Sequence, residues 1–306
     1  MSEKYGINLD FVAGRGSEII PKMQAEQRAG LYLADIIAQG TNTFLTSMKP
    51  MGLLGQIEPL LILPEVLDPK AWPDGQIPFP DKEHTVIPMT MKAQRYFTYN
   101  TTLIKKGELT SYKDALNPEY EGKINLIDPS NQGSGNAFFS FLTRLWSLEE
   151  AKVFLRRLIT DQKVVLTRSY RGQVESVAKG KYAIGLGTQG SAVEHFLRIG
   201  APISDVPLKE VSASHENGVV AIPKTMAHPN AGTVFLNWLL TKEGQTIFSQ
   251  GTGAPVMRVD VSSEGINPTF MIKPGDKVFY DSEEYINFKG RMKKVAKEII
   301  DAHLKR

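Results

Sequence analysis

Apolar and polar residues follow two recurring patterns along this chain. One is a short run in which apolar residues fill every second position or the whole run, and such runs predict strands. They lie at Ile7–Ala13, Ala34–Ala38, Thr85–Met91, Gln94–Asn100, Lys123–Ile127, Lys163–Thr167 and Tyr182–Leu186. The other is a longer segment with apolar residues three or four positions apart, which predicts an amphipathic helix. Strands that alternate with helices predict an α/β fold.

Several predicted strands end in a polar loop that leads directly into a predicted helix. After about Leu103 these loops are Asp128–Asn136, Arg168–Gly172 and Gly187–Ser191, and Gly14–Glu18 and Gly40–Thr43 are similar loops before it. In an open α/β sheet, loops that leave the carboxyl ends of strands line the ligand crevice. Because a helix N-terminus has unpaired N–H groups and a partial positive charge, these loops favour an anionic ligand.

The polar side chains, glycines and arginines at these helix starts are the candidate ligand-binding residues. They are Arg15, Ser17, Thr41, Ser134, Gly135, Asn136, Ser169, Tyr170, Arg171, Thr188 and Gln189. Arginine suits bidentate contacts to carboxylate, sulfonate or phosphonate groups. Each candidate also has a purely structural alternative, because serine and asparagine are common N-caps and an arginine can pair with a surface carboxylate.

Composition excludes several kinds of site. The chain has 306 residues, 36 Lys and Arg against 33 Asp and Glu, and no cysteine. The small net charge and scattered basic residues argue against nucleic-acid binding. The absence of cysteine excludes disulfides, thiol nucleophiles and cysteine-ligated metals. The five histidines show no metal-ligand spacing, and no Walker loop, dinucleotide fingerprint or catalytic triad is present, so we expect no metal site, no cofactor and no catalytic residue.

The two ends of the sequence carry separate expectations. No window approaches the roughly 20 apolar residues of a membrane span, and the first residues lack the pattern of a signal peptide. At the other end, 291–306 is predicted to be an amphipathic helix that packs on the body of the protein. The aromatic residues Phe138, Phe139, Phe141 and Trp146, at helical spacing, are predicted to belong to the core.

The order of several segments resembles a known family. These segments are Ala34–Ile37, Tyr99–Thr101, Ser111–Pro129, Val177–Gly185, Gly218–Lys224, His228–Ala231, Phe235–Leu240 and Lys242–Gln245. Together they are similar to bacterial extracellular solute-binding proteins of ABC importers, in the branch that includes ferric-ion, thiamine and phosphonate binders. The resemblance runs from about Tyr5 to Arg258, and it depends on order and spacing rather than on one diagnostic motif.

The resemblance implies a two-lobe periplasmic-binding-protein fold, type II-like, with two crossover hinge strands. We expect an N-terminal lobe of 1–98 and 222–274 and a C-terminal lobe of 99–221 and 275–306. Hinge residues are expected at Tyr99, Asn100 and Val220. A ligand between the lobes would stabilise the closed form, which would dock on a membrane permease.

The expected function is therefore the capture of a small anionic organic solute by a monomeric, periplasmic or extracellular receptor. Partners would be the solute and an ABC importer permease. Members of the family normally carry a signal peptide and a first strand before the segment that matches Glu3–Ile7, and this sequence has neither there. The alternatives are a ferric-ion or metal-chelate receptor, a cytosolic ligand-sensing module on the same fold and an enzyme. Iron is disfavoured because the ten tyrosines include no adjacent pair.

Overall fold

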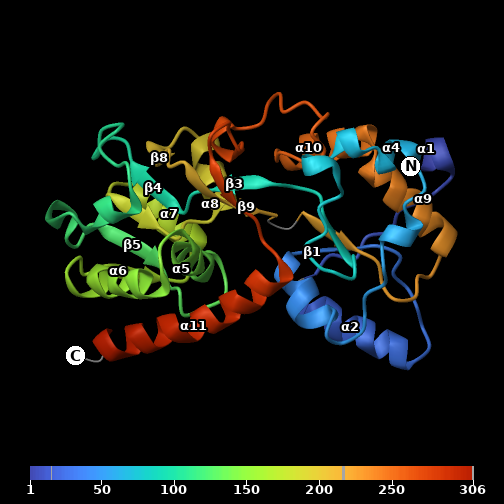
Figure 1. The fold of residues 1–306 in the computed structure, drawn as a ribbon, viewed down its shortest axis with the longest axis horizontal. Helices are drawn as coiled ribbons and strands as arrows, with labels where there is room; N and C mark the ends of the chain where they lie inside the picture. Colours follow the sequence, from blue (N-terminus) through green and yellow to red (C-terminus); the bar gives the residue numbers. More distant parts are fainter. Residues whose placement is uncertain (15, 216–217, 305–306) are drawn as a thin grey trace. The chain divides into compact units, whose positions relative to one another are not determined.

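The computed structural model describes residues 1–14, 16–215 and 218–304, and the chain divides into two compact units (Figure 1). Unit 1 consists of Met1–Lys92, Ala213–Met271 and Asp281–Ile286. Unit 2 consists of Ala93–Ser212, Ile272–Tyr280 and Asn287–Arg306. Both units combine helices with a sheet, so the expected α/β class is confirmed.

Unit 1 contains an antiparallel three-stranded sheet in the order β1 (Ile37–Gln39), β10 (Val219–Ala221), β2 (Val86–Pro88). Alternate residues of β10 enter different clusters: Val220 packs with Ile87, and Val219 and Ala221 pack with Val86. The α-helices of this unit are α1 (Ser2–Tyr5), α2 (Gly16–Arg28), α3 (Thr41–Thr43), α4 (Pro64–Leu67), α9 (Pro229–Leu240) and α10 (Lys242–Thr252). The sheet is thus buried on both faces.

Unit 2 contains a five-stranded sheet in the order β6-β5-β7-β4-β8. The strands are β4 (Phe97–Asn100), β5 (Ile124–Ile127), β6 (Val165–Thr167), β7 (Ile184–Leu186) and β8 (Ile203–Asp205). β5 is parallel to both β6 and β7, whereas β4 is antiparallel to β7 and β8. The mixed sheet places the carboxyl ends of β5, β6 and β7 along one edge.

Helices cover both faces of this sheet. They are α5 (Ser134–Leu145), α6 (Leu148–Thr160), α7 (Tyr170–Ala178) and α8 (Gly190–Arg198). Ile124 and Leu126 of β5 belong to the core that contains α5 and α6, while the side chain of Asn125 between them donates to Ser176 Oγ of α7. Phe138, Phe139 and Phe141 are buried in that core, as predicted.

The chain crosses between the units inside two strands of a third, three-stranded sheet. Its order is β11 (Lys277–Phe279), β9 (Glu210–Ser214), β3 (Lys92–Gln94), and the unit boundaries fall within β3 and β9. The expected boundaries lay later in the chain. Tyr99 and Asn100 are buried in β4, between β7 and β8, and Val220 is buried in β10, between β1 and β2. Since strands on both sides hold these residues inside their units, their hinge role stays a prediction.

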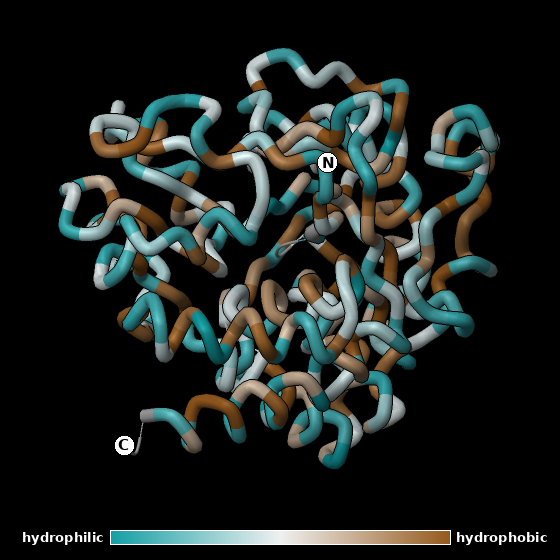
Figure 2. Tube along the Cα trace, turned by 60° about the vertical axis from the view of Figure 1, so that its left-hand side comes forward, coloured by the Kyte–Doolittle hydropathy of each residue, from teal (hydrophilic) through white to brown (hydrophobic). Residues whose placement is uncertain are grey.

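The C-terminal helix α11 (Glu283–Leu304) begins earlier than predicted. Hydrophobic and hydrophilic residues alternate along it toward the C-terminus (Figure 2), which matches an amphipathic helix. Its first turn, within 281–286, belongs to unit 1 and not to the C-terminal unit as expected, because Glu283 pairs with Lys49 and Ile286 is buried beside β1 and β10. Within the described residues no helix has both the length and the apolar character of a membrane span.

The strand predicted at Ile7–Ala13 is wrong. These residues are neither strand nor helix, and the side chains of Phe11 and Val12 are 87% and 68% exposed. A strand requires a neighbouring edge to hydrogen-bond with. In the described part of unit 1 each sheet pairing is made among β1, β2 and β10 and leaves this segment without one. The alternation was present in the sequence, but the pairing partner was not.

Candidate ligand-binding site

Three helix N-termini lie along one edge of the unit 2 sheet. Because Leu126 of β5 is in register with Leu166 of β6 and Leu186 of β7, the parallel strands end side by side. The loops that follow lead within a few residues into α5, α7 and α8. All eight unit 2 candidates from the sequence are therefore brought to this edge: Ser134, Gly135, Asn136, Ser169, Tyr170, Arg171, Thr188 and Gln189.

The start of α5 packs directly against the strand ends. A Cβ on Gly135 would lie 2.2 Å from the carbonyl oxygen of Ile127, so only glycine fits there. The hydroxyl of Ser134 donates to the carbonyl oxygen of Gly187, 2.6 Å away, and ties α5 to the loop after β7. No side chain caps the helix at Gly133. The first amides of α5 thus lack the side-chain acceptor that N-caps usually supply.

Asn136, in the first turn of α5, has a buried side-chain amide group that donates no hydrogen bond within the described chain. The residue is 5% exposed, and its Nδ2 has no hydrogen-bond partner among the described residues. The other buried side-chain atoms without a partner in that part of the chain are oxygens, of which those of Asn125 and Gln173 are examples. Since an unsatisfied buried donor costs about 1–3 kcal/mol, this amide indicates an acceptor that the chain itself does not provide.

Asp128 organises the loop between β5 and α5, a role that the sequence did not reveal. Its carboxylate accepts hydrogen bonds from the amide and hydroxyl of Ser130, at 2.9 and 2.6 Å, and from Asn131 Nδ2 at 2.5 Å. The largely exposed Arg168 reaches the same carboxylate at 3.4 Å. The Asp-Pro-Ser-Asn run after an apolar strand was the available signal, because aspartate commonly accepts from the backbone two residues later.

The start of α7 meets the start of α5 through Tyr170. A Cβ on Gly133 would lie 1.9 Å from the phenol oxygen of Tyr170, and Gly133 has a φ of 137°, so glycine is required there twice over. Ser169 caps α7 by accepting from the amide of Gly172 at 3.0 Å. Ser169 therefore acts as an N-cap, which is the structural alternative stated for the serines. Tyr170 is half-buried and Arg171 is exposed.

The loop before α8 is held by hydrogen bonds to residues of β4 and β3. Thr188 is completely buried, its hydroxyl lies 3.0 Å from that of Thr98, and its carbonyl accepts from Gln94 Nε2 at 2.9 Å. This side chain therefore contacts β4 rather than the surface and supports the site. Gln189, the N-cap position, is half-buried and makes no capping side-chain bond.

The three remaining candidates, Arg15, Ser17 and Thr41, belong to unit 1. Ser17 is exposed in the first turn of α2, and Thr41 begins α3. The two helix starts lie close together, because a Cβ on Gly16 would be 2.6 Å from Thr43 Cγ2. Arg15 lies outside the described residues. The sequence thus predicted one group of candidates in each unit.

Comparison with known proteins identifies the family. Residues 1–266 match the model of the bacterial extracellular solute-binding protein family. The chain belongs to this family. Such solute-binding proteins take up small molecules together with the permeases of ABC importers. A Haemophilus influenzae protein described only as uncharacterized is 26% identical over 290 residues, 92% of this chain and 80% of that one.

Solved structures show the same fold as this solute-binding protein. IdiA (FutA) of Trichodesmium, in complex with iron and citrate, matches with a TM-score of 0.73 and 17% identity, over 98% of this chain and 92% of that one. AfuA of Actinobacillus pleuropneumoniae, with fructose-6-phosphate bound, matches with a TM-score of 0.69 and 19% identity, over 99% and 92% of the two chains. The expected periplasmic-binding-protein fold is confirmed.

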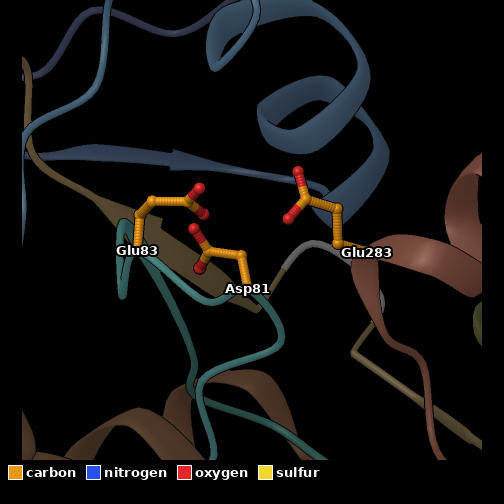
Figure 3. A group of neighbouring side chains, drawn as sticks. All are labelled: Asp81, Glu83 and Glu283. Atoms are coloured by element: carbon orange, nitrogen blue, oxygen red, sulfur yellow. The ribbon is translucent and has the colours of Figure 1, made fainter.

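One group of carboxylates in the described part of this solute-binding protein has the spacing of a metal site. The carboxylate oxygens of Asp81, Glu83 and Glu283 lie within 4.8 Å of one another and point toward a common centre (Figure 3). Lys49 Nζ already pairs with all three, at 3.1 Å from Asp81 and 2.7 Å from Glu283. Desolvation opposes the ammonium charge, but hydrogen bonds to the carboxylates outweigh it and raise the pKa of Lys49 well above its ordinary value. The protein's own cation therefore accounts for this cluster.

A buried carboxyl group lies beneath the start of α8. Asp205 Oδ1 is 2.5 Å from the hydroxyl of Thr98, which in turn contacts Thr188. Removal from water raises the pKa of Asp205 to about 6, although the hydrogen bond from Thr98 and the charge of Arg95 act in the opposite direction. Arg95 is itself buried and paired with Asp276 at 3.1 Å.

The raised pKa of Asp205 predicts a pH-dependent stability. A carboxyl whose folded pKa exceeds its unfolded value stabilises the protein fully below the unfolded pKa, and this contribution is lost as pH rises toward 6. We expect the unfolding free energy of the wild type, relative to Asp205→Asn, to fall by about 2 kcal/mol between pH 4 and pH 7. Urea unfolding of both proteins across this range measures the difference. A difference that stays constant with pH would contradict the assignment.

The contact of Gly135 with Ile127 predicts a local requirement for glycine. Gly135→Ala should lower the unfolding free energy by about 1–3 kcal/mol, because the new methyl group overpacks the strand end. Gly290→Ala is the matched control, since a Cβ at this position of α11 meets nothing within 4 Å. It should be neutral or stabilising by up to about 1 kcal/mol. Equal effects of the two changes, measured by urea unfolding, would show that the close packing at α5 is not real.

Proposed function

We propose that this chain is the solute receptor of an ABC importer and captures a small anionic organic solute at the starts of α5, α7 and α8. The observation that carries the proposal is the uncapped start of α5 together with the unpartnered, buried amide of Asn136. Backbone amides and a side-chain amide are donors, and they require a ligand rich in acceptors. Carboxylates, phosphonates and phosphate esters meet this requirement.

Charge supports the same class of ligand. One helix N-terminus contributes only about 0.3–1 kcal/mol to anion binding, and up to about 2 kcal/mol when it is partly buried. Three starts along one edge, with the phenol of Tyr170 and the guanidinium of Arg171, multiply that contribution. Citrate and fructose-6-phosphate, which are bound in the two structural neighbours described above, are anions of this kind.

The proposed mechanism is ligand-stabilised closure. In this proposal the unit 1 candidates Arg15, Ser17 and Thr41 also contact the solute. Closure is a rotation of the units about hinge strands near Tyr99, Asn100 and Val220. A ligand that binds the closed form more tightly than the open form shifts the population toward closure, and the permease would recognise that form. This mechanism forms no covalent bond, so the proposed receptor is not an enzyme. We propose further that it is monomeric and periplasmic, as the family resemblance implies.

Ferric iron, bound with or without an organic chelator, is the second candidate. IdiA with iron and citrate, and iron-bound HitA of Pseudomonas aeruginosa, share the fold. In this chain Tyr170 places one phenol oxygen beside Gly133 at the candidate site. A single phenol with neutral amides is a poorer ligand set for a hard cation than for an anion. The dependence of binding on iron distinguishes the ferric-iron candidate from the anionic-solute candidate.

A ligand panel tests the proposed class. Citrate, fructose 6-phosphate and methylphosphonate, each with and without Fe(III), are compared with spermidine by thermal shift and calorimetry. We expect saturable binding of at least one metal-free anion, and a ligand at about 100 times its Kd should add about 2.7 kcal/mol of stability. Binding only in the presence of Fe(III) would replace the proposal with the iron candidate. Preference for spermidine would refute both.

Asn136→Leu separates a ligand contact from a structural role. The change removes the amide but keeps the volume, so the affinity for the panel's anion should fall about tenfold or more. The unfolding free energy without ligand should not fall and should rise by up to about 1–3 kcal/mol, because the change removes an unsatisfied buried donor that has no partner to lose among the described residues. Ser140→Ala, one turn further along the buried face of α5, is the matched control and should bind normally. Equal affinity of Asn136→Leu and the wild type would remove Asn136 from the site.

A further inference from the structure

Unit 1 contains a pocket of about 340 Å³ that is separate from every residue of the candidate ligand-binding site. It is formed within 58–84, and its wall includes Glu58, Leu61, Trp72, Ile77, Phe79 and His84. This volume falls in the range of about 300–1,000 Å³ that small-molecule sites occupy. This segment contains several prolines, which are common in turns and loops.

The wall of this pocket combines apolar and aromatic side chains with polar groups. Trp72 is 3% exposed, and its indole N–H donates to the carbonyl oxygen of Val66 at 2.7 Å, so the polar atom of this ring is already paired within the protein. The ring of Phe79 stacks on the imidazole of His84, with centroids 4.2 Å apart and an angle of 11° between planes. Leu61 and Ile77 also line the pocket. Such a wall accommodates a flat, apolar group.

The ionisable groups of the pocket are a carboxylate and an imidazole that contact each other. His84 Nδ1 lies 2.6 Å from Glu58 Oε2, which is hydrogen-bonding distance. When Nδ1 carries the proton, the remaining ring nitrogen and the carboxylate are both acceptors. Among the described residues that line the pocket there is no lysine or arginine. Arg258 lies over the Trp72 ring, 5.6 Å from its centroid, but its charge is paired with Asp260 at 2.8 Å.

The backbone of His84 adopts a conformation that is energetically unfavourable for a residue with a side chain. Its φ of 53° lies in the left-handed region, which non-glycine residues adopt rarely. Two hydrogen bonds fix this conformation, from the amide of Ile57 to the carbonyl of His84 at 2.9 Å and from the amide of His84 to Asp81 at 3.2 Å. Strained residues of this kind are concentrated at ligand sites. The left-handed backbone, the ring stack and the hydrogen bond to Glu58 coincide at His84.

We propose that this pocket binds a small amine with an aromatic or apolar body. The ammonium group pairs with Glu58, and the body packs against the apolar and aromatic part of the lining, whose rings also attract a cation. The negative charge at the pocket selects against carboxylates and phosphates. The site is thus opposite in charge preference to the one at the helix starts of unit 2, and it does not depend on the proposed function.

Two probes of the same size test this inference. Phenethylamine and phenylacetate share the aromatic ring and differ in the sign of the charged group. The three tryptophans give three indole N–H signals in a ¹H–¹⁵N spectrum of the full chain, and Trp72→Phe identifies the signal of Trp72. We expect phenethylamine to shift this signal in a saturable manner, with phenylacetate at least about tenfold weaker.

Two variants distinguish the amine pocket from nonspecific adhesion. Glu58→Gln, at a side chain that is 63% exposed, should weaken phenethylamine binding about fivefold or more without affecting folding. Asn136→Leu should leave phenethylamine binding unchanged, and Glu58→Gln should leave anion binding unchanged. Equal affinity for the two probes, or no saturable shift of the Trp72 signal, would overturn the proposal. Failure here leaves the anion site standing, because the two readouts use different residues.

Discussion

The close contact between the first turn of α5 and the carboxyl end of β5 determines how the candidate site is built. Gly135 permits the contact, because any side chain there would collide with the carbonyl oxygen of Ile127. As a consequence, α5 begins against the sheet edge itself, and Ser134 joins it to the loop after β7. The phenol of Tyr170 then fits over Gly133. Glycines at the α5 start, and not a set of charged side chains, bring two of the helix starts together.

The organisation of unit 2 could be predicted from the sequence because it is local. Each strand, loop and helix there is a run of neighbouring residues, and parallel strands must end along one edge once they pair. The predictions for β5, β6, β7 and the following helices are confirmed. All eight unit 2 candidates lie at that edge, although Thr188 and Ser169 support the structure through Thr98 and Gly172.

The features that the sequence did not predict depend on partners distant in sequence. Ile7–Ala13 has the alternation of a strand but no edge to pair with among the described residues, and the unit boundaries fall within β3 and β9, whose pairing the local pattern does not encode. The ion pair between Lys49 and Glu283 likewise joins residues that are 234 positions apart. The unpartnered amide of Asn136 is also invisible in the sequence, because burial and hydrogen-bond supply are properties of the fold.

The central claim is that donors at the helix starts of unit 2 hold an anionic solute. Backbone amide chemical shifts of the full chain, followed during titration with the anion that binds most tightly, measure it directly. The account predicts that the largest saturable shifts occur at the amides of Ser134, Gly135, Asn136 and Gly190 and at the side-chain amide of Asn136. Saturable binding that leaves these signals unmoved while others shift would contradict it.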